Sequence, residues 1–240
     1  MTAACLAVAA FFAVTPVASP TPSAAPQCTT TPPKASGLLV VGVGDSITFG
    51  TGTSHPPETS FLARAASSIG ARYVDLGIAA AATAQIASEV DAIPLDADVV
   101  VVYVGTNDVS IAADFLAPAP VALEKIRVLE ANVDPLIAAV RARVPAARLV
   151  LITVRDFGRV QRQLKLDSTR FTAAGFTAAV VDWNAHLRAV AAQYGAAVLD
   201  LEKDPQWYVA AEYGGAPGDV HPNDDGAARL ARAVAPLLAP

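Results

Sequence analysis

Short valine-rich segments alternate with longer segments of helical periodicity, and this alternation limits the possible folds most strongly. The clearest is 98–104, DVVVVYV, an apolar run typical of a strand that is buried on both faces. Segment 38–43 has the same character, and 72–77, 148–154 and 196–201 are also predicted to be strands. Because strands that alternate with helices form βαβ units, we predict an α/β protein, a three-layer α/β/α sandwich with a flavodoxin-like five-stranded parallel sheet.

The segments between these runs have the periodicity of helices. They are 60–69, 79–90, 121–144, 178–194 and 223–238. Pro135 lies inside the longest of them and is expected to kink or break it. Right-handed crossovers bring the carboxyl ends of all parallel strands to one edge of the sheet, where ligands bind. Polar residues that directly follow the strands are therefore the candidates for a functional site.

The N-terminal part of the chain differs in composition from the rest. Residues 2–14 are apolar but too few for a comfortable membrane span, and small residues follow them, which predicts a secretory signal peptide over residues 1–26. No Lys or Arg precedes the apolar stretch, so an uncleaved N-terminal anchor is the alternative. Residues 27–37, rich in Pro, Thr and Ser, predict an extended tether. The folded domain is expected to span 38–240 and to be secreted, without a stable membrane span after cleavage.

Charge and cysteine content exclude several classes of protein. Only 16% of residues are charged, the net charge is -5 and no basic run is present, so nucleic acid is not an expected partner. Cys5 lies in the predicted signal peptide and Cys28 in the tether, so no internal disulfide is expected after cleavage. Neither cysteine has the spacing of a metal site. We expect a monomer without metal or cofactor.

Four motifs occur at the points where the predicted sheet would place its ligand-binding edge. Ser46 follows the first strand in Gly44-Asp45-Ser46, Gly77 follows the second, and Asn107 follows the third in GTND. His221, followed by Pro and Asn, precedes the last helix. This order resembles the four blocks of the SGNH/GDSL hydrolase family, and the resemblance spans residues 38–240. It implies that Ser46 is the nucleophile and His221 the base. It also implies an oxyanion hole made of the backbone N–H groups of Ser46 and Gly77 and the side-chain amide of Asn107.

The chemistry of acyl transfer requires residues of these types. A serine hydroxyl is a poor nucleophile until a base takes its proton, and an imidazole can do so at neutral pH. The tetrahedral intermediate needs donors directed at its oxyanion. Of the two other histidines, His186 lies in a helical segment and is interpreted as a surface or core residue. His55 lies in the loop after the nucleophile and could line the pocket.

Two departures from the family pattern concern the second and last blocks. The family usually has Asn two residues before Gly77 and a second Gly three residues after it, but this chain has Asp75 and Ala80. The third member of the family's triad stands three residues before the histidine, where this chain has Gly218. Asp219, one residue later, is the predicted third member. The alternative is a Ser–His dyad, in which a backbone carbonyl or water orients the imidazole.

The main hypothesis is a secreted serine esterase or lipase that hydrolyses carboxylic esters through an acyl-enzyme on Ser46. Small-molecule, lipid and polysaccharide esters are all candidate substrates. The alternatives within the fold are a carbohydrate deacetylase similar to acetylxylan esterases, a lysophospholipase and a thioesterase. A catalytically silent carbohydrate-binding module is the alternative from another class. A dinucleotide-binding fingerprint is excluded, because Ile47 occupies the place of its third glycine.

The loops 51–59, 110–120 and 155–175 are expected to determine the substrate. The last is polar and irregular, and is predicted to be a partly helical flap. Ile111, Phe115 and Leu116 are candidates either for an acyl pocket or for the core.

Overall fold

The computed structural model describes residues 37–113, 117–157, 174–202, 212, 219 and 221–239. The predicted signal peptide, all but the last residue of the tether and most of the predicted flap lie outside these residues, and so do Phe115 and Leu116. The domain boundaries stay predictions. No helix in the described part of the chain has both the length and the apolar character needed to cross a membrane.

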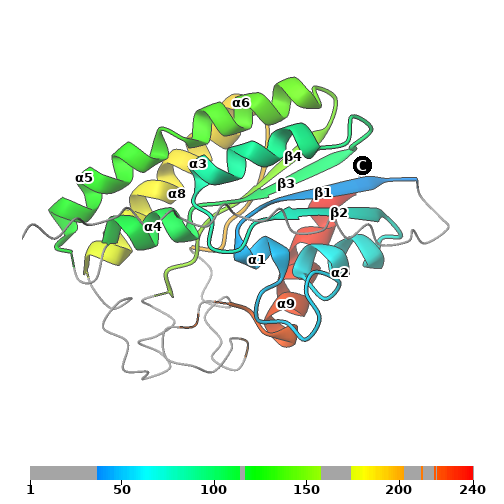
Figure 1. Cartoon of the computed structure of the whole chain (residues 1–240), viewed down its shortest axis with the longest axis horizontal. Helices are drawn as coiled ribbons and strands as arrows, with labels where there is room; N and C mark the ends of the chain where they lie inside the picture. Colours follow the sequence, from blue (N-terminus) through cyan, green and yellow to red (C-terminus); the bar gives the residue numbers. More distant parts are fainter. Residues whose placement is uncertain are drawn as a thin grey trace, which may run out of the picture.

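Five parallel strands form one sheet in the described part of the chain (Figure 1). They are β1 (Leu39–Gly44), β2 (Arg72–Gly77), β3 (Val99–Tyr103), β4 (Arg148–Ile152) and β5 (Ala197–Leu199). Their order across the sheet is β2-β1-β3-β4-β5, and every neighbouring pair is parallel. The strand order reverses beside β1, and ligands bind at such a switch point in open α/β sheets.

Helices cover both faces of the sheet, as the predicted three-layer sandwich requires (Figure 1). One face carries α3 (Thr83–Ile86), α4 (Thr106–Ala113), α5 (Ala119–Glu130), α6 (Val133–Arg143) and α8 (Ala174–Tyr194). The other face carries α1 (Ser46–Phe49), α2 (Phe61–Ser68) and α9 (Asp224–Leu238). Helix α5 packs against α8, and α2 packs against α9. The predicted fold class is confirmed.

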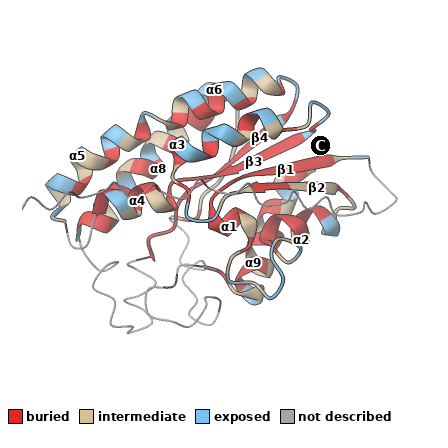
Figure 2. Ribbon diagram, in the orientation of Figure 1, coloured by how far each residue is buried: buried red, intermediate tan, exposed pale blue. Residues whose placement is uncertain are grey.

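The core lies along the two central strands. Every residue of β1 and β3 is buried (Figure 2). Because helices cover both faces, a side chain is buried on whichever face it points to, which explains why these runs show no polar alternation. Full burial of one valine contributes roughly 1.5–3 kcal/mol relative to an exposed one. The two strands therefore give a rigid base to the residues that follow them.

Three predicted helices have different boundaries in the structure, and the one predicted over 178–194 is α8, which begins at Ala174. The predicted helix 121–144 is two helices, α5 and α6, and Pro135 lies in the first turn of α6, where a backbone N–H would have no intrahelical partner. The predicted helix 79–90 begins only at Thr83 and continues as the 3-10 helix η1 (Ala87–Ala92). Ala80 precedes it with φ of +61°, a conformation that no helix contains. Alanine has the highest helix propensity of all residues, so composition alone did not reveal this turn.

Candidate active site

Ser46 is presented by a tight turn between β1 and α1. Asp45 caps the short helix, because its Oδ1 accepts the N–H of Ile47 at 2.9 Å. Ser46 is the first helical residue, so its own N–H has no intrahelical partner and lies at the sheet's ligand-binding edge. A Cβ on Gly44 would lie 2.2 Å from Oγ1 of Thr48, so only glycine allows α1 to fold back so close to the strand.

Two ionisable side chains near the nucleophile, Asp45 and Arg155, are buried. Asp45 is fully buried, and burial raises its pKa to about 6, although the N–H of Ile47 and the positive charge of Arg155 offset part of this effect. Arg155 is itself only 2% exposed, and its guanidinium lies over the ring of Phe157, 5.2 Å from the ring centroid. The sequence placed Arg155 in a polar flap, whereas the structure buries it. The nearby charge of Asp108 raises the pKa of Asp45 further, and the guanidinium of Arg155 has the smallest effect, so the net shift is upward.

His221 lies within hydrogen-bonding distance of Ser46, 175 residues away in the chain. Its Nε2 is 2.9 Å from Oγ of Ser46. The two residues come from opposite ends of the domain, Ser46 from the end of β1 and His221 from the segment just before α9. The structure therefore brings together the predicted nucleophile and base at a distance that permits direct proton transfer.

Asp219 orients the imidazole despite its shifted position in the sequence. Its Oδ1 lies 2.9 Å from Nδ1 of His221 and also accepts the backbone N–H of His221 at 2.9 Å. Aspartate side chains commonly accept the N–H two residues ahead, and this local turn directs the carboxylate at the ring. The three side chains form a continuous hydrogen-bonded chain from Ser46 through His221 to Asp219. The catalytic roles of its three members stay predictions.

Contacts from α2 and the loop after α1 hold the His221 segment. Asn223 caps α9, and its Oδ1 accepts two backbone N–H groups at 3.1 Å. Gly52 has φ of +95° and lies so close that a Cβ there would be 2.7 Å from Cβ of His221. An ion pair between Arg64 of α2 and Asp224 of α9 joins the two helices beside this loop. The base is therefore fixed from three sides.

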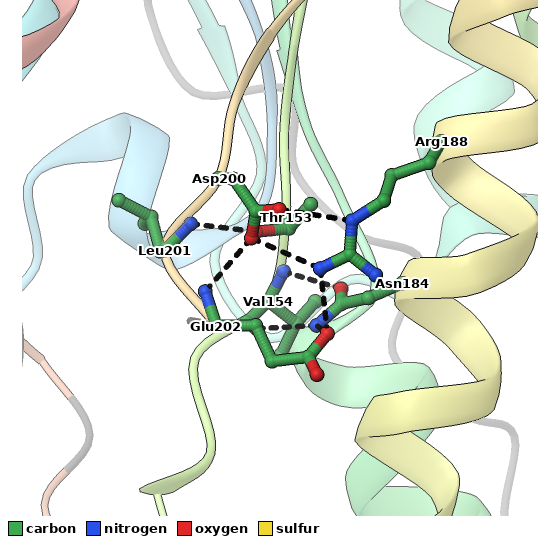
Figure 3. Close-up of polar contacts among 7 residues, drawn as sticks. All are labelled: Thr153, Val154, Asn184, Arg188, Asp200, Leu201 and Glu202. Carbon is green, nitrogen blue, oxygen red and sulfur yellow. Dashed lines mark hydrogen bonds and ion pairs between the residues drawn. The ribbon is translucent and has the colours of Figure 1, made fainter. Parts of the chain in front are cut away.

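A polar network fastens the ends of β4 and β5 to α8 (Figure 3). Its members are Thr153, Val154, Asn184, Arg188, Asp200, Leu201 and Glu202. Arg188 donates to both oxygens of Asp200 at 3.0 Å and to Glu202 at 2.7 Å. Burial opposes ionisation of Asp200, but the bonds and charge of Arg188 prevail and hold the pKa of Asp200 below its usual value. The network anchors the strand end from which the chain proceeds toward Asp219.

Asn107 lies at the start of α4 with one amide hydrogen uncommitted among the described residues. Its Nδ2 donates to the carbonyl oxygen of Ala81 at 2.9 Å, and a side-chain amide carries two donors. The neighbouring Asp108 is fully buried and accepts both the N–H and the hydroxyl of Thr83, at 3.0 and 2.9 Å. Burial raises the pKa of Asp108. These bonds join α4 to α3 and hold Asn107 against the turn that follows β2.

The geometry does not support the predicted oxyanion role of Gly77. Its N–H donates to Oδ1 of Asp75 at 2.6 Å. The next N–H, of Ile78, donates to Gly44 of β1 at 2.9 Å, and successive amides of a strand point to opposite sides. The N–H of Gly77 therefore points away from β1. The pattern of apolar residues gave no sign of this direction, which depends on the register between the strands.

The turn after β2 offers another backbone donor. The N–H of Ala81 bonds to Ile78, and that of Ala82 bonds to Gln85. For the N–H groups of Ala79 and Ala80, no hydrogen bond is found among the described residues. Ala80 stands where the resembled family usually has its second glycine, and its positive φ is the conformation that a glycine would adopt freely.

The remaining candidates lie elsewhere. His186 pairs with Asp134 of α6 at 2.9 Å, in agreement with its interpretation as a surface or core residue. His55 is exposed, and its Nδ1 is 3.1 Å from Oγ of Ser54. Ile111 is exposed on α4. In the described ranges, no group of three or more His, Cys, Asp or Glu side chains could hold a metal ion.

Comparisons with known proteins agree with this geometry. The model of the GDSL-like Lipase/Acylhydrolase family matches residues 43–229. The structure is similar to an extracellular lipase from Streptomyces rimosus, with 21% identity, TM-score 0.59 and coverage of 81% of this chain and 98% of that one. It is also similar to a lipase/acylhydrolase from Enterococcus faecalis, with 20% identity, TM-score 0.57 and coverage of 84% and 95%.

A third similar structure is phospholipase A1 from Streptomyces albidoflavus NA297, with 16% identity, TM-score 0.59 and coverage of 82% of this chain and 99% of that one. No curated protein matches the sequence. At these identities the structural likenesses establish the fold, while the family model covers most of the chain together with Ser46, Asn107 and His221. The chain therefore belongs to the GDSL-like lipase/acylhydrolase family of ester hydrolases.

Proposed function

We propose that this protein is a secreted serine esterase or lipase that hydrolyses carboxylic esters through an acyl-enzyme on Ser46. The observation that carries the proposal is the continuous hydrogen-bonded chain from Oγ of Ser46 through His221 to Asp219, each contact 2.9 Å long. This chain lies at the carboxyl edge of the sheet in a member of an ester hydrolase family. It contains the parts of a serine hydrolase triad.

The mechanism follows from the position of each atom. With a proton on Nδ1 facing Asp219, Nε2 of His221 is free to accept the proton of Ser46 as Oγ attacks the ester carbonyl carbon. The ring then returns that proton to the leaving alcohol, and an acyl-enzyme remains. A water molecule, deprotonated by the same nitrogen, attacks the acyl-enzyme carbonyl carbon. The bond to Oγ then breaks, the ring returns the proton to Oγ of Ser46, and the carboxylic acid leaves. Asp219 keeps the ring in the required tautomer and stabilises its charged form.

Three donors are proposed to stabilise the oxyanion. They are the N–H of Ser46, the second amide hydrogen of Asn107, and an N–H of the turn at Ala79 and Ala80 in place of Gly77. All belong to segments that leave β1, β2 and β3 at the same edge. Because the donors are held by packed elements, they need no rearrangement when charge develops.

Replacing Asn107 with alanine is expected to lower kcat by about 100- to 1000-fold, the usual loss for one oxyanion donor. KM should change little, since the donor acts mainly on the transition state. Steady-state kinetics with p-nitrophenyl acetate measure both constants. Ser110→Ala is a matched control, because Ser110 lies one helical turn further along α4 and its hydroxyl donates to the carbonyl oxygen of Thr106. A kcat within threefold of wild type for Asn107→Ala would remove Asn107 from the oxyanion hole.

The substrate class is proposed from chemistry and from similar proteins. Similar structures include an extracellular lipase and a phospholipase A1, so acyl esters of lipids, together with short-chain esters, are our first choice for this chain. Secretion is proposed from the same likeness and from the predicted signal peptide and tether. Acetylated polysaccharides, lysophospholipids and thioesters are the alternatives within the same chemistry. We propose a monomer that needs no cofactor.

Covalent labelling and a substrate series test this function together. A fluorophosphonate probe is expected to add its mass to the peptide that contains Ser46, and p-nitrophenyl esters of increasing chain length to be hydrolysed. Assays on acetylated xylan and on phospholipid then separate the substrate classes. Folded protein without labelling and without turnover of any of these esters would contradict the proposal and favour a silent carbohydrate-binding module.

A further inference from the structure

Asp75 is a buried carboxylate that the proposed reaction does not use directly. Its Oδ1 accepts the N–H of Gly77 at 2.6 Å, and its Oδ2 accepts the hydroxyl of Tyr73 at 3.0 Å. Asp75 is 8% exposed and Tyr73 3%. Both oxygens therefore have a protein partner, and the shorter contact has the length of a strong, charge-assisted hydrogen bond.

The position of β2 explains why this contact exists. β2 is an edge strand, with β1 on one side and no strand on the other in the described part of the chain. The N–H of Gly77 points to the open side, where a further strand would otherwise accept it. Asp75 takes the place of that strand for this one amide. Gly77 pairs in register with Gly44, two residues before Ser46.

The turn that begins at Gly77 is held at two points. The carboxylate of Asp75 holds its beginning through the N–H of Gly77. Asn107 holds its end by donating to the carbonyl oxygen of Ala81 at 2.9 Å. Between them stands Ala80, whose φ of +61° is strained for a residue with a side chain. Such a conformation persists only where its surroundings determine it strongly.

Burial of the Asp75 carboxylate lowers the stability of the folded state at neutral pH. Burial raises the pKa of Asp75 to about 6, although the bonds from Gly77 and Tyr73 offset part of the effect. Its folded pKa therefore lies above the unfolded value, so the folded state loses stability as pH rises from about 4 to about 6. Tyr73 is the titratable group that faces Asp75, and burial raises the pKa of Tyr73 well above 10, so it stays neutral in this range. A buried carboxylate that lowers folding stability, next to an alanine in a strained conformation, is typical of a functional site.

We propose that Asp75 is a positioning residue for the oxyanion hole, because its bond to Gly77 fixes the turn that presents the N–H groups of Ala79 and Ala80. The proposal rests on the proposed function, since it assigns this turn to the proposed oxyanion hole. In this role the side-chain oxygen that accepts the N–H of Gly77 is required, and the negative charge of the carboxylate is not. An asparagine, which has an oxygen in the same place, should therefore serve as well.

Two variants separate the oxygen from the charge. Asp75→Ala removes the acceptor and is expected to lower kcat by about 10- to 100-fold with KM within about threefold, because small displacements of a catalytic donor have effects of this size. Asp75→Asn keeps an acceptor for Gly77 and is expected to keep kcat within about threefold of wild type at pH 8. Steady-state kinetics with p-nitrophenyl acetate distinguish the two.

Thermal melting gives an independent readout. Asp75→Asn is expected to melt at a higher temperature than wild type at pH 8, and the gain should disappear near pH 4, where the wild-type carboxyl is protonated. Glu130→Gln is a matched control, because Glu130 is also 8% exposed and burial also raises its pKa, but it lies on α5 away from the site. It should raise the melting temperature at pH 8 without a change in kcat.

Three results would overturn the proposal. They are full kcat in Asp75→Ala, an Asp75→Asn variant as slow as Asp75→Ala, and an equal loss of kcat in Glu130→Gln. Ser46→Ala, assayed in parallel, keeps these results separate from the proposed function. If Ser46→Ala is inactive and Asp75→Ala is fully active, the esterase proposal stands and the role of Asp75 fails. If Ser46→Ala keeps its activity, the proposed function itself fails.

Discussion

Replacing Ser46 with alanine is expected to lower kcat on p-nitrophenyl acetate by about 10⁴- to 10⁶-fold, the range measured when the nucleophile of a serine hydrolase triad is removed. The remaining rate would come from the oxyanion donors acting on a bound ester and water. Within the described ranges, the hydroxyl of Ser46 bonds to Nε2 of His221 and to no structural partner, so the fold should tolerate the change. Fluorophosphonate labelling should be lost with the activity.

Ser54→Ala is the matched control for this substitution. Ser54 lies in the loop near His221, but its hydroxyl donates to Asp224 at 3.3 Å rather than to the imidazole of His221. Its kcat should stay within about threefold of wild type, since exposed hydrogen bonds contribute little. A Ser46→Ala variant that keeps more than one hundredth of the wild-type rate, with an unchanged melting temperature, would show that another residue is the nucleophile.

Replacing Asp219 with asparagine is expected to lower kcat by about 10³- to 10⁴-fold, because an orienting carboxylate replaced by an amide leaves the imidazole in the wrong tautomer. An amide N–H directed at Nδ1 would place the ring proton on Nε2, and Nε2 could then no longer accept from Ser46. Because Oδ1 of Asp219 makes both contacts, an amide with its N–H toward the ring also leaves the backbone N–H of His221 without this acceptor, so the local turn is expected to loosen. Kinetics and circular dichroism of the same sample measure the two effects.

Asp224→Asn is the control for Asp219→Asn, because Asp224 is close in sequence and bonds to Arg64 and Ser54 rather than to the ring. Its kcat is expected to change by less than about tenfold, since it removes a partly exposed ion pair. If Asp219→Asn also loses less than tenfold, a backbone carbonyl or a water orients the imidazole and the site is a dyad.

The sequence was sufficient to predict the fold because the evidence for it is local and repeated. Most strands of the sheet are apolar runs, with Arg72 and Asp75 of β2 as exceptions, and the strands alternate with helical segments. This alternation favours one topology, a parallel sheet covered by helices. The motifs around Ser46, Asn107 and His221 were likewise recognisable. Each lies next to a strand or helix whose end is at the ligand-binding edge of the sheet. The carboxylate two residues before His221 was also predicted. Its ability to reach the ring depended on a turn that only the structure shows.

The residues that sequence reasoning missed depend on contacts between distant segments. The direction of the N–H of Gly77 follows from the register between β2 and β1, which no apolar run reveals. Arg155 is buried although the segment that begins there is polar, and a polar segment does not reveal how it packs against the fold. The turn at Ala80 lies in an alanine-rich segment whose propensity favours a helix. Asp75 and Ala80 departed from the family pattern, and these departures marked the part of the site that was predicted least well.

The bonding of Asp219 to two atoms of His221 makes the acid and the base a local cassette, in which one carboxylate oxygen orients the ring. Only the distance from this cassette to Ser46 depends on the docking of α9 against α2. Glu212 ties the chain before Asp219 to the same docking, because its carbonyl oxygen accepts the N–H of Asn223 and its carboxylate pairs with Arg229 of α9. An engineer who wants to keep the proton relay should therefore leave Glu212 and the interface of the last helix unchanged.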